Sequence, residues 1–179
     1  MFRIIFFSVF AYLAGCSSVT ALETTYIPFE NKGWKVGYVT DTRYQTLVEF
    51  VPDNETVLNW SRMLNIQFFE GVRKPVQQVM PVLMAGIQRS CPDVTWFVLS
   101  EDSASVTYEW SVENCKGQDD QTEIVRLLQG NDGVQRIAFV CKSEYCDPQE
   151  QAIVLDDFSK AYVEKNGKKI ILKPKVFFK

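Results

Sequence analysis

Alternation of apolar and polar residues predicts a series of short β-strands. The clearest pair is Val94–Leu99 and Val106–Val112, which are rich in β-branched and aromatic residues and flank the polar stretch 101–105. A second predicted hairpin joins Gly33–Asp41 to Gln45–Val51. Further strands are predicted at 65–69 and 134–141, and a last extended segment at 169–178.

Two segments have the periodicity of helices. Pro75 stands where a first helical residue would, and apolar residues follow it at helical intervals as far as Ile87. The stretch Asp147–Glu150 combines a capping residue, a proline in the first turn and a glutamate at the third position. It predicts a second helix that runs to about Lys165.

The segment Asp120–Leu128 fits two structures. An acid or hydroxyl residue followed three positions later by Glu123 resembles a capping box, and the apolar residues after it share one helical face. This pattern favours a short helix. A strand is the alternative, because Gly130–Gly133 could turn a hairpin.

The predicted order is hairpin, strand, helix, hairpin, short helix, strand, helix, strand. Strands that come in groups, without alternating strictly with helices, are typical of α+β proteins. We therefore expect a single α+β domain over residues 26–179, with a mostly antiparallel sheet and two main helices packed on one face.

The amino-terminal residues have the layout of an export signal. Arg3 precedes the apolar run Ile4–Leu13, which is too short for a permanent membrane span. The run ends in Leu13-Ala14-Gly15-Cys16, and this tetrapeptide resembles the lipobox of bacterial lipoproteins. An ordinary secretory signal cleaved after Ala21 is the alternative.

The lipoprotein resemblance implies a membrane-anchored product. It implies that residues 1–15 are removed, that the Cys16 thiol receives a diacylglyceryl group, and that the new amino terminus is acylated with palmitate. Ser17 in place of an aspartate implies sorting to the outer membrane of a Gram-negative cell. Residues 16–25 would then form a lipidated tether, and the membrane would be the first partner of the domain.

Composition excludes several kinds of chemistry. The sequence contains no histidine, which excludes Ser-His-Asp and Cys-His nucleophile systems and the common zinc sites with histidine ligands. It contains no Gly-x-Gly-x-x-Gly and no phosphate-binding loop motif. The net charge is −3, or −4 once Arg3 is removed, which argues against nucleic acid as a partner. We expect no cofactor.

The strand pattern predicts how the cysteines pair. If Trp96 faces Trp110 and Val98 faces Tyr108, all the large residues of that hairpin lie on one face. The same register brings together the two cysteines that flank the hairpin. The predicted disulfides are Cys91–Cys115 and, by elimination, Cys141–Cys146.

Other uses of these cysteines fit the spacing less well. Separations of 24, 26 and 5 residues lack the Cys-x-x-Cys spacing that is common in zinc sites and in thioredoxin-like redox pairs. We therefore expect structural disulfides, which an exported protein can form and keep.

Three features of the sequence are candidates for a functional role. Residues 165–179 carry six lysines and no acid, which fits an edge strand guarded against aggregation or, alternatively, contact with an acidic partner, lipid headgroups or a cell-wall polymer. Glu101, Asp102 and Glu109 include carboxylate pairs of a kind used for glycoside hydrolysis, although acidic pairs are common. The stretch Trp110–Val140 resembles uncharacterised bacterial envelope proteins, a resemblance that implies no active residues.

These observations favour a non-catalytic protein. We expect a periplasm-facing lipoprotein of the outer membrane that has a binding or structural role in an envelope assembly, such as a secretion apparatus, with protein partners there. The alternatives are an envelope hydrolase that uses carboxylates and a ligand-binding lipoprotein with an aromatic pocket.

Overall fold

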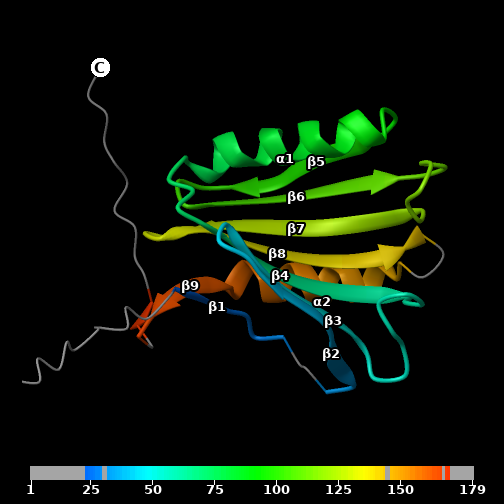
Figure 1. Ribbon diagram of the computed structural model, residues 1–179, viewed down its shortest axis with the longest axis horizontal. Coiled ribbons are helices and arrows are strands. Elements are labelled where there is room, and N and C mark those ends of the chain that lie inside the picture. Colours follow the sequence, from blue (N-terminus) through cyan, green and yellow to red (C-terminus); the bar gives the residue numbers. More distant parts are fainter. Residues whose placement is uncertain (1–22, 30–31, 144–145, 167, 170–179) are drawn as a thin grey trace, which may run out of the picture.

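The computed structural model describes residues 23–29, 32–143, 146–166 and 168–169. Seven strands form one sheet in the order β2-β3-β4-β8-β7-β6-β5, with every neighbouring pair antiparallel (Figure 1). Its strands are β2 (Trp34–Asp41), β3 (Gln45–Pro52), β4 (Arg62–Glu70), β5 (Thr95–Glu101), β6 (Ser105–Val112), β7 (Gln121–Gln129) and β8 (Gly133–Lys142). A three-stranded sheet contains β1 (Thr24–Tyr26), β9 (Tyr162–Lys165) and β10 (Lys168–Lys169), and the helices are α1 (Val76–Ser90) and α2 (Pro148–Lys160).

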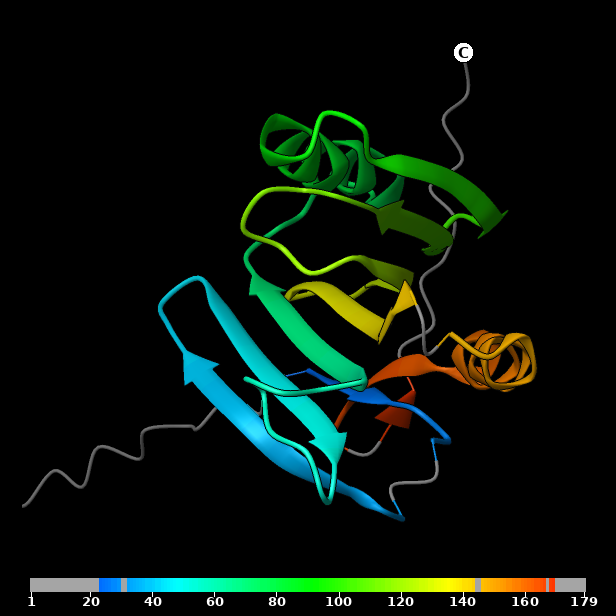
Figure 2. The ribbon, with the colours of Figure 1, turned by 90° about the vertical axis from the view of Figure 1, so that its right-hand side faces the viewer.

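The predicted α+β class with a mostly antiparallel sheet is confirmed, but the two helices lie on opposite faces of that sheet (Figure 2). Val125 and Leu127 of β7 belong to the core on the α1 side, whereas Ile124 and Leu128 belong to the core on the α2 side. Each helix shows its apolar stripe in the sequence, but the stripe does not tell which face of the sheet it covers.

The prediction of a short helix at 120–128 is wrong, and the alternative strand is what forms. This segment is β7, which pairs with β6 on one side and β8 on the other. A central strand covered on both faces has a nearly continuous apolar run, and such a run can imitate a helical face. The turn at Gly130–Gly133 closes the β7–β8 hairpin, with the Gly130 N–H donating to the Gly133 carbonyl at 2.9 Å.

The second main helix is shorter than predicted. It ends at Lys160, and Tyr162–Lys165 forms β9, which pairs with β1 and with β10. The local sequence continues the helical pattern, but pairing with β1, which is distant in sequence, and with the adjacent β10 makes this segment a strand. Of the extended segment predicted at 169–178, Lys169 lies in β10 and the remainder lies outside the described residues.

The predicted register of the β5–β6 hairpin is confirmed. Trp96 faces Trp110 and Val98 faces Tyr108, with a bulge after Val98. Both predicted cysteine pairs are joined: Cys91–Cys115 ties the end of α1 to the end of the hairpin, and Cys141–Cys146 ties β8 to the start of α2, each with 5.5 Å between Cα atoms.

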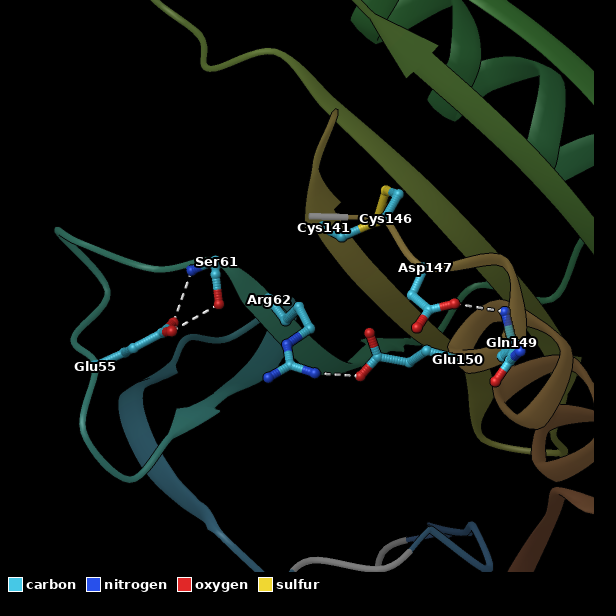
Figure 3. A network of polar contacts seen from close by, with 8 residues as sticks. All are labelled: Glu55, Ser61, Arg62, Cys141, Cys146, Asp147, Gln149 and Glu150. Carbon is cyan, nitrogen blue, oxygen red and sulfur yellow. Dashed lines mark hydrogen bonds and ion pairs between the residues drawn. A yellow bond between two sulfur atoms is a disulfide. The ribbon is translucent and has the colours of Figure 1, made fainter. Parts of the chain in front are cut away.

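Polar contacts add to the second disulfide in fixing α2 to the sheet (Figure 3). Asp147 caps the helix, because its carboxylate accepts from the Gln149 N–H at 2.8 Å. Arg62, at the start of β4, forms an ion pair with Glu150 in the first turn at 2.5 Å. The start of α2 is therefore held by a covalent bond, a cap and an ion pair within a few residues.

A candidate binding groove beside helix α1

A groove of about 500 Å³ lies on the α1 side of the large sheet. It exists because α1 packs against β6 and β7, and side chains of β3 and β4 on the same face line the space beside the helix. We call it the α1 groove. It is lined by Gln45, Leu47, Glu49, Asn65, Gln67, Phe69, Leu83, Ile87, Tyr108, Trp110, Gln118, Gln121, Glu123 and Arg136.

Strand register places the groove residues in rows. Glu49 of β3 lies directly opposite Asn65 of β4, and Leu47 lies opposite Gln67. Directly opposed residues of an antiparallel pair have Cβ atoms about 4.5–5.5 Å apart, so their side chains can share one ligand group. The Gln67 amide donates to the Gln45 side chain at 2.9 Å, which orders one end of the row.

A buried ion pair forms part of the floor. The Arg136 guanidinium bonds to the Glu123 carboxylate, and the Trp110 indole N–H donates to the same carboxylate at 3.0 Å. The side chains of Arg136 and Glu123 are only 13% and 8% exposed. Burial lowers the pKa of Arg136, whereas the nearby charge of Glu123 raises it. The net shift of this pKa is upward. The guanidinium therefore stays charged. Burial raises the pKa of Glu123, and the charge of Arg136 and the hydrogen bonds from Trp110 and Arg136 oppose that shift. Because both of these donors bond the carboxylate, the ionised form is the one that this geometry suits, and the two charges of the pair cancel.

Glu49 differs from Glu123 in having no partner. Its backbone belongs to the β3–β4 ladder, but its carboxylate has no hydrogen-bond or ion-pair partner among the described residues, and the residue is half-buried. Burial raises the pKa of Glu49, the nearby charge of Glu123 raises it further, and Arg136 opposes the shift. Because the Glu123–Arg136 pair is neutral, Glu49 leaves the lining of the groove with one net negative charge.

Asn65 is the second unsatisfied group. It is 8% exposed, and its side-chain oxygen has no hydrogen-bond donor among the described residues. A buried acceptor without a donor costs about 1–3 kcal/mol. A ligand that brings an N–H group to this position would remove that cost.

The groups that line the groove are carboxylates, side-chain amides, one phenol, one guanidinium and apolar side chains. Burial is the main cause that raises the pKa of Tyr108 to about 12, so its hydroxyl stays neutral at ordinary pH. The residues that line the groove include no Ser, Thr, Cys or Lys. Among the described residues, no group of three or more acids and cysteines is placed to hold a metal ion.

The acids considered in the sequence do not form one site. Asp102 holds the β5–β6 turn, where its carboxylate accepts from the Ala104 N–H at 2.7 Å and from the Ser105 N–H at 2.8 Å. Glu109 lies on β6 between Tyr108 and Trp110, so it points away from the face that those residues line. Glu101 does not line the groove. The lipidation candidate Cys16 lies outside the described residues.

Sequence reasoning missed Glu49, Asn65, Glu123 and Arg136. A usable signal existed in β8, where Arg136 shares a face with Val134, Ala138 and Val140. An arginine in an otherwise apolar row needs a buried acid nearby. That acid, Glu123, lies in the segment predicted as a helix, so the pair was not recognised.

Strand β5 forms a second unusual surface. It is one of the two outer strands of the seven-stranded sheet, and all seven of its residues are exposed, including Trp96 at 42% and Phe97 at 53%. It contains neither lysine nor proline, the residues that commonly protect an edge.

Within the part of the chain that the structure describes, none of the helices has the length and apolar character needed to cross a membrane.

Comparisons with known proteins leave the family open. No protein-family description and no curated protein sequence matches the chain. Among solved structures, the Ran-binding protein Mog1p of Saccharomyces cerevisiae is similar, with a TM-score of 0.39 and 11% identity over 77% of this chain and 85% of that one. A likeness this distant carries no conclusion about function.

Proposed function

We propose that the protein is a lipid-anchored envelope lipoprotein that binds a ligand or partner without catalysis, facing the periplasm from the outer membrane. The proposed location in the cell envelope rests on the Leu-Ala-Gly-Cys sequence that ends at Cys16. The binding role rests on the α1 groove, in which Glu49 and the Asn65 oxygen are both left without partners by the described residues. Unsatisfied polar groups that line a half-open groove support a missing ligand better than a structural role.

The start of the folded domain supports close attachment to the membrane. Glu23 is 3% exposed, and its carboxylate accepts from the N–H groups of Asn131 and Asp132, both at 2.9 Å. The ordered structure therefore begins before residue 26 and includes residues that the sequence assigned to the tether. Glu23 lies seven positions after Cys16, and a chain of that length spans at most about 25 Å. The β7–β8 turn would lie near the membrane surface.

The edge strand supports the assembly part of the proposal. An apolar strand with a free backbone edge is a liability in an isolated protein, because it invites pairing with other chains. In an envelope assembly that edge would be covered. The hydrolase alternative gains no support from the groove, because Arg136 and Trp110 occupy the Glu123 carboxylate and leave Glu49 as a single free acid.

The anchor is tested by metabolic labelling with palmitate in a Gram-negative host. We expect label on the wild-type protein, fractionation with outer membranes, and loss of both in Cys16→Ala, because stable anchoring requires more than one acyl chain. Ser18→Ala is the matched control and should keep the label. Normal cleavage and membrane fractionation of Cys16→Ala would contradict the anchor.

A further inference from the structure

We infer that the α1 groove binds a cationic, hydrogen-bond-donating group, a primary ammonium or a guanidinium, carried on an apolar chain. The inference rests on the proposed function, since it names the chemical class of ligand for the same groove.

The net charge of the groove lining determines whether a ligand should be a cation or an anion. The buried Glu123–Arg136 pair is neutral, which leaves Glu49 as the uncompensated charge of the lining. Among the lining residues the only cation is Arg136, which Glu123 already holds. An anion in the groove would face Glu49 without compensation, whereas a cation would form an ion pair with it in a partly desolvated position.

Hydrogen bonding decides the kind of cation. Glu49 and Asn65 are directly opposed across β3 and β4, and both offer acceptor oxygens that the described residues leave unused. An ammonium carries three donors and a guanidinium five, so either can bond both residues at once. A quaternary ammonium has no N–H and would leave the Asn65 oxygen unpaired. A bare metal ion would find only one free carboxylate among the lining residues, because Arg136 and Trp110 hold Glu123.

The apolar residues of the lining indicate that the cationic group is attached to an apolar chain. Leu47 and Phe69 on the sheet and Leu83 and Ile87 on α1 supply apolar surface around the polar row. At about 500 Å³ the groove has the size of small-molecule sites, so it admits the charged group together with an apolar chain. The same chemistry occurs in free alkylamines and in basic side chains of peptides, and these two sources can be separated by experiment.

The test uses the mature, lipidated chain in phosphatidylcholine nanodiscs, with empty nanodiscs as the blank. Saturation-transfer NMR measures binding of butylammonium against butyrate, and of acetyl-Leu-Lys-Leu-amide against acetyl-Leu-Gln-Leu-amide. We expect binding of both cationic probes and none of butyrate. A lysine peptide that binds more than tenfold tighter than butylammonium assigns the site to peptides, and equal affinities assign it to free amines.

Two matched variants locate the site. Glu49→Gln removes the free charge with little change in shape and should weaken binding of the cationic probes about tenfold or more. Glu109→Gln makes the same change on a strand residue outside the groove and should leave affinity unchanged. Circular dichroism of both variants confirms folding. Equal binding of butyrate and butylammonium, or unchanged affinity in Glu49→Gln, would overturn the inference.

Failure of this inference is distinguishable from failure of the proposed anchor. Absence of cation binding in a protein that still carries palmitate rejects the ligand class alone. Cation binding in a protein without acyl chains rejects the anchor alone.

Discussion

Glu49 illustrates how a single residue that lines a candidate site can reduce the stability of the fold. Its half-buried carboxylate faces the α1 groove without a partner among the described residues, and burial raises its pKa above the ordinary value. A raised pKa means that the folded state binds the proton more tightly than the unfolded state. The favourable contribution is therefore complete below pH 4.5 and is lost as the pH rises through the folded pKa. At neutral pH the ionised group costs stability.

We therefore predict that Glu49→Gln is slightly more stable than the wild type at pH 7. The gain should stay below about 1 kcal/mol, because solvent screens a half-exposed carboxylate. Urea unfolding followed by tryptophan fluorescence measures it at pH 7 and pH 4, and the difference should shrink at the lower pH. A variant less stable than the wild type at pH 7 would show that Glu49 has a structural partner.

The buried Glu123–Arg136 pair should behave in the opposite way. Arg136→Met leaves the Glu123 carboxylate buried without its cation, and removing one partner of a buried pair costs about 3–5 kcal/mol. The double variant Glu123→Leu with Arg136→Met removes both charges and should recover most of that loss. Urea unfolding of the two variants checks this. A single variant that loses less than about 1 kcal/mol would mean that the pair is solvated.

At the scale of elements, the two disulfides close loops of different length. Cys91 and Cys115 are 24 residues apart and Cys141 and Cys146 are 5 apart. Loop-closure entropy then predicts stabilisation of about 3.5 and about 2 kcal/mol, respectively. We predict that replacing both cysteines of the first pair by serine costs more stability than replacing both of the second. Unfolding midpoints in urea give the order, and a reversed order would show that strain or α2 anchoring outweighs chain entropy.

The edge strand β5 makes a prediction about self-association. Phe97→Lys places a charge on the exposed apolar edge and should reduce concentration-dependent association of the purified protein. Leu58→Lys is the control, because Leu58 is 93% exposed in the connection between β3 and β4 and is not part of β5. Analytical ultracentrifugation compares the two. An equal effect of both substitutions would mean that added charge alone, and not the edge, controls association.

Local sequence predicted some elements well because their pairing is local. The β5–β6 register follows from alternation of large side chains across a short turn, and the pairing of Cys91 with Cys115 followed from it. The prediction of a helix at Asp120–Leu128 was wrong because a strand that is buried on both faces has the same apolar pattern as a short helix. The predicted end of α2 was wrong because the residues after Lys160 form β9, which pairs with β1, more than a hundred residues earlier, as well as with the adjacent β10.

The α1 groove could not be predicted from local sequence patterns, because it too depends on contacts between residues that are distant in sequence. Its polar residues come from β3, β4, β7 and β8. The order of strands that makes these four neighbours cannot be deduced from the sequence of any one segment. The face that α1 covers also decides which part of the sheet stays open. In the sequence, Glu49 is a polar residue within the strand Gln45–Val51, a pattern that a solvent-facing residue shares.

At the scale of the whole molecule, the amino-terminal end of the domain is locked to the body. The Glu23 carboxylate holds the β7–β8 turn, and a Cβ at Gly130 would overlap it. Thr25 adds a hydrogen bond to Gln135 at 2.9 Å, and Lys165 pairs with Asp132 at 2.6 Å in the same region. A tether attached here would hold the domain in a limited range of orientations above the membrane, with its position set by seven residues.

Mass spectrometry of the mature amino terminus, purified from a Gram-negative host, tests the central claim most directly. The account predicts a chain that begins at Cys16, with a diacylglyceryl group on sulfur and an acyl group on the terminal nitrogen. A chain that begins at Leu22 with a free amine, as cleavage after Ala21 would give, would contradict it.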